Sequence, residues 1–252
     1  MANCYLIFGA TGGIGSTLVR QLATEGHHLA ISGRNIAKLE LLQKETNAIP
    51  IPGDLAEWEC IQEIVASAKD ALGGLDGVSS CIGSLLLKPA HLTSRDDYDA
   101  ILATNLTTSF GIVRAATTSL FSTGGSIVLT ASAAAKIGIA NHEAITTAKA
   151  GVMGLIQSAA ASYAPRKIRI NGVAPGLVET PLSAPLLNTP AGRLGSEHMH
   201  PLGRIGNTCE IARSIAWLLS PEQSWITGQT LAVDGGLASL LPKARATKNR
   251  SS

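Results

Sequence analysis

The sequence predicts an α/β fold in which helices cover both faces of a doubly wound parallel sheet. Short apolar runs alternate with longer amphipathic stretches along most of the chain. This alternation is typical of βαβ units, whose strands are buried on both faces. The chain has 252 residues, of which 45% are hydrophobic and 15% are charged. It therefore has enough apolar material for one large core, and no linker or internal repeat divides it.

Apolar runs mark the expected strands, and amphipathic stretches mark the helices between them. In the helical stretches the apolar residues recur three or four positions apart. In chain order, strands are predicted at residues 5–8, 28–31, 77–80, 126–130, 168–173 and 230–233, and helices at residues 15–25, 36–46, 57–72 and 96–120. A further helix is expected around Lys149, and it continues through residues 150–161 with small side chains on nearly every side.

Two segments depart from this pattern. Residues 181–204 contain four prolines among leucines, histidines and glycines. We expect an irregular insertion here, and such an insertion is usually a lid over a functional site or a disordered loop. Residues 242–252 are expected to be a disordered basic tail after one domain that spans residues 1–241.

The charge balance argues against a nucleic-acid-binding protein. The 20 basic and 18 acidic residues give a net charge of +2, and four of the basic residues lie in the last ten positions, so the rest of the chain carries −2. Aromatic residues make up only 4% of the chain, which disfavours a surface for stacking bases. No uncharged apolar run is long enough to span a membrane, so no membrane contact is expected.

The cysteines indicate neither a metal site nor a disulfide framework. Cys4, Cys60, Cys81 and Cys209 are scattered, and none shows the spacing of a zinc site. We therefore expect no bound metal. The chain opens into a strand rather than a signal peptide, so a reducing cytoplasmic compartment is the default expectation.

A glycine-rich turn follows the first predicted strand and opens the first helix. Residues 9–15 read Gly-Ala-Thr-Gly-Gly-Ile-Gly. Glycines let the backbone approach a pyrophosphate, and the free N–H groups at a helix N-terminus attract its negative charge. The turn therefore predicts a site for a dinucleotide.

The spacing of these glycines resembles that of the short-chain dehydrogenase/reductase family, and further segments resemble family motifs in the same order. Asp54-Leu55 matches an adenine contact, and residues 80–83 (Ser-Cys-Ile-Gly) take the place of an Asn-Asn-Ala-Gly segment. Residues 171–180 match a segment over the nicotinamide, and residues 226–236 match the closing strand. The resemblance implies a Rossmann-type fold that binds a nicotinamide dinucleotide.

The resemblance also implies which residues contact this cofactor. The Val178 backbone and the Thr180 hydroxyl would hold the nicotinamide carboxamide, and Lys149 would bind the nicotinamide ribose. The full expected set is Gly9, Thr11, Gly13, Ile14, Gly15, Ser32, Arg34, Asp54, Leu55, Ser80, Gly83, Lys149, Pro175, Gly176, Val178 and Thr180.

The end of the second strand indicates which dinucleotide is preferred. Relatives that use NAD(H) need a carboxylate here to accept hydrogen bonds from the ribose 2′-hydroxyl. Gly33 takes that place, and Arg34 follows it. A guanidinium binds a 2′-phosphate, which a carboxylate would repel. The sequence therefore favours NADP(H), with NAD(H) as the alternative, although the glycine turn lacks the additional Arg or Lys of many relatives that use NADP(H).

The catalytic set implied by the resemblance is incomplete. Ser132 would polarise the substrate oxygen, Asn105 would anchor a water of a proton relay, and Lys149 would lower the pKa of a tyrosine four positions before it. That position holds Ile145. The tyrosine is the acid or base in the family, and such catalysis is typically worth about 10²–10⁴-fold in rate. Isoleucine has no proton to give.

Two substitutes for the tyrosine are open. His142 precedes Ile145 by three residues, so on a continuous helix the two would share a face, and imidazole titrates near neutrality. A histidine at a helix start is more often a surface residue, in particular if Asn141 caps the helix. The other substitute is a water that is relayed through Lys149 and Asn105.

The sequence supports two functions on this fold. The first is an NADP(H)-dependent oxidoreductase that acts on a carbonyl or alcohol, or on a C=N or C=C bond, of a small, partly apolar molecule. The second is a nucleotide-binding protein without redox turnover. Ser132 and Asn105 favour the first, because a binding protein does not need them. The helix around Lys149 forms a dimer face in relatives, so a homodimer or homotetramer is also expected.

Overall fold

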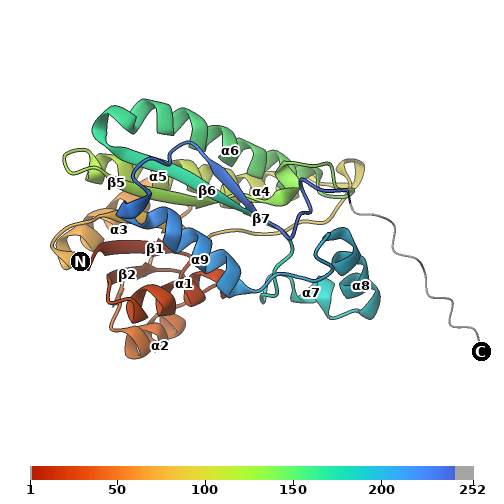
Figure 1. Ribbon diagram of the computed structural model, residues 1–252, viewed down its shortest axis with the longest axis horizontal. Helices are drawn as coiled ribbons and strands as arrows, with labels where there is room; N and C mark the ends of the chain where they lie inside the picture. The colour runs from red at the N-terminus through yellow and green to blue at the C-terminus, as the bar shows by residue number, and fades with distance from the viewer. Residues whose placement is uncertain (1, 242–252) are drawn as a thin grey trace, which may run out of the picture.

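Seven strands form one sheet at the centre of the protein (Figure 1). The computed structural model describes residues 2–241, and the predicted basic tail, residues 242–252, lies outside the described residues. The strands are β1 (Cys4–Phe8), β2 (His28–Ser32), β3 (Ile49–Pro50), β4 (Gly77–Ser80), β5 (Gly125–Thr130), β6 (Ile168–Pro175) and β7 (Thr230–Val233). Their order across the sheet is β3-β2-β1-β4-β5-β6-β7, and every neighbouring pair is parallel, which confirms the predicted fold class.

Helices cover both faces of this sheet, as Figure 1 shows. They are α1 (Gly13–Thr24), α2 (Ile36–Thr46), α3 (Trp58–Leu72), α4 (Arg95–Leu102), α5 (Thr108–Leu120), α6 (Glu143–Tyr163), α7 (Ala184–Leu187), α8 (Pro190–Met199) and α9 (Thr208–Leu219). Successive residues of β1 point to opposite faces. Leu6 and Phe8 therefore pack with α3, α5 and α6, whereas Tyr5 and Ile7 pack with α1, α2 and α9. The sheet thus separates two apolar cores.

Most of the predicted elements lie within one or two residues of the observed bounds. The short strand β3 is missing from the prediction, because two residues that include a proline carry no apolar period. The helix predicted at residues 96–120 is α4, a π-helical turn η2 (Ala103–Thr107) and α5 in succession. The sequence pattern does not distinguish this turn from the helix on either side.

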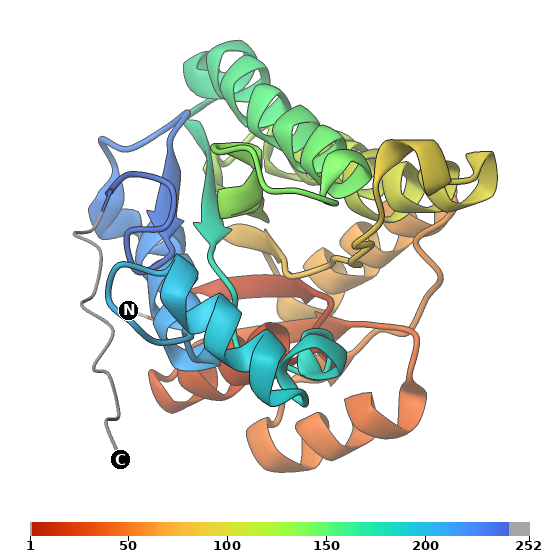
Figure 2. The same ribbon diagram turned by 90° about the vertical axis from the view of Figure 1, so that its right-hand side faces the viewer.

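The insertion at residues 181–204 is helical rather than irregular, which corrects the sequence expectation. It contains α7 and α8, which stand beyond the end of the sheet toward which β6 and β7 run (Figures 1 and 2). Pro185 and Pro190 lie in the first turns of the two helices, where a proline costs no intrahelical hydrogen bond. The hydroxyl of Thr189 accepts a hydrogen bond from the N–H of Gly192 and so caps α8. The prolines therefore start helices here.

The strand order reverses between β1 and β4, and this reversal positions the site. Ligands of open parallel sheets bind beyond the carboxyl ends of the strands at such a point. The glycine turn leaves β1 there, and the N–H of Cys81, just after β4, donates to the carbonyl of Phe8 at 3.0 Å. Within residues 2–241, no helix is both long and apolar enough to cross a membrane.

Candidate active site

The glycine-rich turn joins β1 to α1 and leaves the start of the helix open. Gly9 has a φ of +71°, a left-handed conformation that glycine adopts without strain. A Cβ atom on Gly15 would collide with the carbonyl oxygen of Gly9, so the turn closes only because residue 15 is glycine. Gly12 caps α1 without a side-chain hydrogen bond. The first N–H groups of the helix are therefore left to an anion.

β2 ends beside this turn and presents a cation. Gly33 is buried, and a Cβ atom there would lie 3.2 Å from the hydroxyl oxygen of Thr11. A side chain at position 33 would therefore press on Thr11. Arg34 is exposed and forms no salt bridge with any described residue. The fully buried hydroxyl of Ser32 has no hydrogen-bond partner within residues 2–241.

The adenine-side residues follow β3 at the surface. Asp54 is exposed, and its Oδ1 accepts a hydrogen bond from the N–H of Ala56 at 3.3 Å. The neighbouring Leu55 is partly buried against the core, and its carbonyl accepts a hydrogen bond from the hydroxyl of Thr108 at 3.5 Å. This loop is thus held to the fold through Leu55, and the Asp54 carboxylate faces solvent.

The segment after β6 packs directly against the glycine turn. A Cβ atom on Gly13 would lie 2.9 Å from Cγ2 of Thr180, so residue 13 has to be small. The hydroxyl of Ser183 accepts a hydrogen bond from the N–H of Thr180 at 3.0 Å and donates one to the carbonyl of Val178. The glycine turn, predicted to hold the pyrophosphate, is therefore in contact with the segment predicted to hold the nicotinamide carboxamide. Ser183 fixes the conformation of that segment.

Lys149 lies buried beyond the ends of β4 and β5. Its ammonium donates a 2.7 Å hydrogen bond to the carbonyl of Thr130, and the hydroxyl of Thr130 donates one of 2.7 Å to the carbonyl of Ser80. Lys149 is only 4% exposed. Burial lowers the pKa of Lys149 to about 8, and the nearby Cys81 thiol opposes this shift. The amine is therefore mostly charged at neutral pH but releases its proton more readily than an exposed lysine does.

Asn105 lies in η2, the π-helical turn between α4 and α5. Its Nδ2 donates to the hydroxyl of Ser84 at 2.9 Å and to the carbonyl of Ile101 at 3.0 Å. Its Oδ1 accepts from the N–H of Ser84 at 3.2 Å. A Cβ atom on Gly83 would lie 3.5 Å from this Oδ1 and 3.7 Å from the Lys149 Nζ. Asn105 and Lys149 therefore flank the same bare stretch of backbone, and π-turns are frequent at functional sites.

Ser132 caps a short turn that is tied to α6. Its Oγ accepts a hydrogen bond from the N–H of Ala134 at 3.2 Å, at the start of η3 (Ala133–Ala135). The hydroxyl of Thr146, on α6, donates to the carbonyl of Ala134 at 3.2 Å. The turn that carries Ser132 is thus anchored to the residue that follows Ile145 in the chain.

His142 lies just before α6 rather than within it. The helix begins at Glu143, and the neighbouring Asn141 adopts a φ of +63° instead of capping it. The ring Nδ1 of His142 lies 2.8 Å from the carbonyl oxygen of Ala140. The helical face that His142 and Ile145 were expected to share is therefore not formed, and a catalytic role for His142 stays a prediction.

Ile145 fills an apolar cluster between α4 and α6. The residue is 4% exposed. Buried side chains of Ile101, Ala144 and Ala148 form the cluster with it, and Leu86, Tyr98, Leu102 and Leu106 pack against them from the edge. The side chain of Ile145 thus joins two helices by apolar contact, and it supplies no hydrogen bond.

Comparison with known proteins decides the family. Residues 9–238 match the family described as Enoyl-(Acyl carrier protein) reductase. A glucose 1-dehydrogenase from Gluconobacter oxydans (strain 621H) is 30% identical over 240 residues, which cover 92% of this chain and 90% of that protein. A solved short-chain type dehydrogenase/reductase from Mycobacterium ulcerans has a TM-score of 0.88 at 28% identity, over 94% of this chain and 91% of its own. The chain belongs to the short-chain dehydrogenase/reductase family.

A further solved structure shows a relative with a dinucleotide in place. ElxO with NADP bound has a TM-score of 0.89 and 25% sequence identity, and the match covers 95% of this chain and 100% of that one. The short-chain dehydrogenase/reductase fold therefore extends over nearly the whole of both chains.

Two further side chains hold candidate site residues in place, and neither belongs to the motifs that predicted the site. Ser84 bonds both ends of the Asn105 amide, and Thr130 links Lys149 to β4. Neither position carries a sequence signal, because a serine after a glycine and a threonine at a strand end are common in loops. Among residues 2–241, no three His, Cys, Asp or Glu side chains gather as metal ligands.

The buried amine makes stability depend on pH. The unfolded lysine has an ordinary pKa of 10.5 and the folded one a pKa of about 8, so the unfolded chain binds more protons between these values. Stability therefore rises with pH across this window, and the cost of burying the charge is full below it. We expect Lys149→Met to have a higher free energy of unfolding than wild type at about pH 7, because the variant buries no charge. This difference between the two proteins should become smaller by about 2 kcal/mol between about pH 7 and pH 9.5.

Urea unfolding of the cofactor-free proteins at several pH values measures this change. Lys44→Met, at an exposed position on α2, controls for the loss of one positive charge. Parallel pH profiles for wild type and Lys149→Met would contradict the predicted burial of a charged amine.

Proposed function

We propose that this protein is an NADP(H)-dependent oxidoreductase that acts on a carbonyl, an alcohol or a C=N or C=C bond of a small molecule. The observation that carries the proposal is the convergence of Lys149, Asn105 and Gly83 beyond the sheet, on the side where the segment after β6 meets the glycine turn. A buried cation next to bare backbone suits a ribose and a reacting oxygen. Burying a charge costs free energy, and binding a ligand at this position gives a reason for that cost.

The glycine cradle fits a nicotinamide dinucleotide. The open start of α1 would hold the pyrophosphate, because a Cβ at Gly15 would fill the turn and α1 has no side-chain cap. The Val178 backbone and the Thr180 hydroxyl would hold the carboxamide, and Lys149 would bind the nicotinamide ribose. The bound dinucleotide supplies a hydride to the substrate or accepts one from it. That ElxO, a family member, binds NADP adds support for this class of cofactor.

The preference for NADP(H) rests on Arg34. The guanidinium is exposed and not engaged by any described acid, and Gly33 leaves no carboxylate to repel a 2′-phosphate. The crowding of Gly33 by Thr11 further disfavours an acidic side chain at that position. NAD(H) stays the alternative, because the glycine turn adds no second cation.

Proton supply is then the task of Lys149. Ile145 has no acid, and the ammonium of Lys149, with its pKa lowered by burial to about 8, is charged at neutral pH and holds a labile proton. We propose that this proton reaches the substrate oxygen through water near Asn105, while the Ser132 hydroxyl polarises that oxygen. The hydrogen bond from Lys149 to the Thr130 carbonyl keeps the amine aimed along this edge.

Nucleotide binding without turnover is the second candidate. The burial of Ile145 among Ile101, Ala144 and Ala148 favours it, because this packing has replaced the family's acid by a purely structural contact. In either case we propose self-association through α6, whose outward face carries the small exposed residues Ala150, Gly154 and Ala161. The substrate side is apolar around Leu85, Leu86 and Leu87, which suits a partly apolar molecule.

The cofactor preference gives the first test of function. We expect wild type to bind NADPH more tightly than NADH. Arg34→Ala should weaken NADPH binding by about 10- to 100-fold, because charge-assisted hydrogen bonds to the 2′-phosphate are lost, and should leave NADH binding within about twofold. Equilibrium fluorescence titration measures both constants. Lys44→Ala, at the other end of α2, is the control of equal charge change, and tighter NADH than NADPH binding by wild type would refute the preference.

Restoring the hydroxyl gives the second test. Ile145→Tyr places a phenol four residues before Lys149, and we expect the initial rate of NADPH oxidation with a panel of ketones and aldehydes to rise by about 10²-fold. Ile145→Phe adds nearly the same bulk without a proton, so it should show no gain. Equal rates for the two variants would mean that the rest of the site is not competent for carbonyl reduction.

His142→Ala completes this comparison. Because the ring lies outside α6 and next to the Ala140 carbonyl, we expect the wild-type rate to change by less than about twofold. A loss of rate greater than tenfold with unchanged NADPH affinity would instead assign the proton to His142, on the scale of about 10²-fold for a lost general acid.

A further inference from the structure

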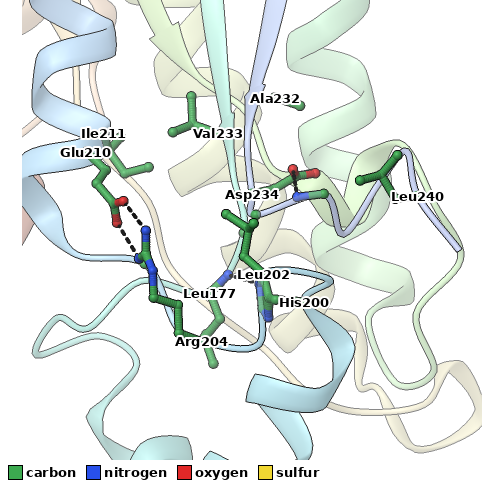
Figure 3. Close-up of a pocket in the computed structure, with 14 residues that line it drawn as sticks. Leu177, His200, Leu202, Arg204, Glu210, Ile211, Ala232, Val233, Asp234 and Leu240 are labelled. Carbon is green, nitrogen blue, oxygen red and sulfur yellow. Dashed lines mark hydrogen bonds and ion pairs between the residues drawn. The ribbon is translucent and has the colours of Figure 1, made fainter. Parts of the chain in front are cut away.

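A buried histidine connects α8 to the segment that follows β6. His200 follows the last residue of α8 and is 4% exposed. Its Nε2 accepts a 3.1 Å hydrogen bond from the N–H of Leu177 (Figure 3). Its Nδ1 lies 2.6 Å from the carbonyl oxygen of Ser196, inside α8. One imidazole therefore bridges two segments that are more than twenty positions apart in the chain.

These two bonds select one form of the ring. A backbone N–H only donates, so Nε2 must carry a lone pair toward Leu177. A carbonyl oxygen only accepts, so Nδ1 must carry the proton toward Ser196. The bridge therefore needs the neutral ring with its proton on Nδ1. A protonated ring has an N–H on both nitrogens, and it would turn one of them against the N–H of Leu177.

The ring is held in place by close packing on the backbone. A Cβ atom on Gly176 would lie 2.6 Å from the Nε2 of His200 and 3.0 Å from the Cα of Asp234. The next residue, Leu177, is fixed at both of its backbone groups: its N–H donates to His200, and its carbonyl accepts from the N–H of Gly206 at 2.9 Å. No side chain on residue 176 fits between this backbone and the ring.

The charged groups that line the same pocket have partners of their own. The pocket has a volume of about 420 Å³ (Figure 3). The Asp234 carboxylate, at the end of β7, accepts from the N–H groups of Gly236 and Ala238. Arg204 pairs with Glu210, on α9, through two hydrogen bonds of 3.0 and 2.6 Å.

On α8 itself, the titratable neighbours of His200 are Glu197 and His198, and His198 is exposed. No hydrogen bond or salt bridge joins either side chain to the His200 ring within residues 2–241. The polar contacts of the ring in the described structure are therefore those to Leu177 and Ser196.

We propose that His200 is a positioning residue, which in its neutral form couples the α7–α8 insertion to the cofactor-binding segment at residues 177–180. The coupling rests on the proposed function, in which Val178 and Thr180 hold the nicotinamide carboxamide. When α8 is seated, the ring fixes the backbone directly before Val178. When His200 is protonated or α8 moves away, Leu177 loses its acceptor, and its backbone keeps only the hydrogen bond from Gly206. Cofactor binding and the position of the insertion are thereby linked.

Two conservative variants separate the bonds of the ring. His200→Gln keeps a carbonyl oxygen at a reach similar to that of Nε2, so it can accept from Leu177. His200→Asn keeps an N–H at a reach similar to that of Nδ1, so it can serve Ser196 but not Leu177. Neither side chain titrates. The pair therefore differs in the bond that the proposal requires, while both remove the imidazole and its protonation.

The bond itself is measured without cofactor, by hydrogen–deuterium exchange of the Leu177 amide. We expect this amide to exchange at least about tenfold faster in His200→Asn than in wild type, and His200→Gln to stay close to wild type, because a lost hydrogen bond of about 1.4 kcal/mol is a tenfold change. Equal exchange rates of the Leu177 amide in the two variants would overturn the proposed role of the hydrogen bond between His200 and Leu177. If His200→Asn does not fold, wild type alone decides it: a Leu177 amide that exchanges at the intrinsic rate of an unprotected amide overturns the hydrogen bond to His200.

The coupling is measured by NADP⁺ titration of the same proteins. We expect His200→Asn to raise the dissociation constant by about fivefold to tenfold, and His200→Gln by less than about twofold. If wild type binds no NADP⁺ and no NAD⁺, the proposed function fails. The amide exchange still decides whether His200 holds the Leu177 N–H. If wild type binds NADP⁺ and all three proteins have the same dissociation constant, the coupling is wrong.

Discussion

The buried ammonium of Lys149 is the constraint on which the rest of the site depends. A charge taken out of water has to be met by hydrogen-bond acceptors, and the Thr130 carbonyl at the end of β5 is placed to do so. That placement needs β4 and β5 to end side by side, and the Thr130 hydroxyl joins them through Ser80. Gly83, after β4, and the π-turn of Asn105 lie against the same amine, since a Cβ on Gly83 would be 3.7 Å from the Lys149 Nζ and 3.5 Å from the Asn105 Oδ1.

Sequence patterns were sufficient for the fold class and for the position of the glycine turn between β1 and α1. The apolar alternation predicts a parallel sheet because buried strands and amphipathic helices obey different periods. The glycine turn is predictable because a Cβ on residue 15 would collide with the carbonyl oxygen of Gly9, so that position requires glycine. The prediction was wrong for the insertion at residues 181–204, where the structure has helices. Prolines that suggested an irregular insertion instead start α7 and α8, since a proline in the first turn costs nothing.

The contacts that orient the candidate site residues were not predictable from the sequence. Ser84 holds the Asn105 amide and His200 holds the Leu177 backbone, and each of these pairs is distant in sequence. A polar side chain in a loop is compatible with many partners, so its type alone does not select one. The geometry of His142 was unpredictable in the same way, because the helix begins only at Glu143 and the His142 ring lies against the Ala140 carbonyl.

The isoleucine at position 145 changes the role that is open to Lys149. In a site with a tyrosine, the lysine's charge has a phenol to act on. Here the phenol is absent, and the space between α4 and α6 is closed by apolar packing around Ile145. The amine itself is buried, and desolvation is the largest cause of its lowered pKa, about 8. Under the proposed function, the substitution that removes the family's acid leaves proton supply to Lys149, whose burial makes its proton easier to release.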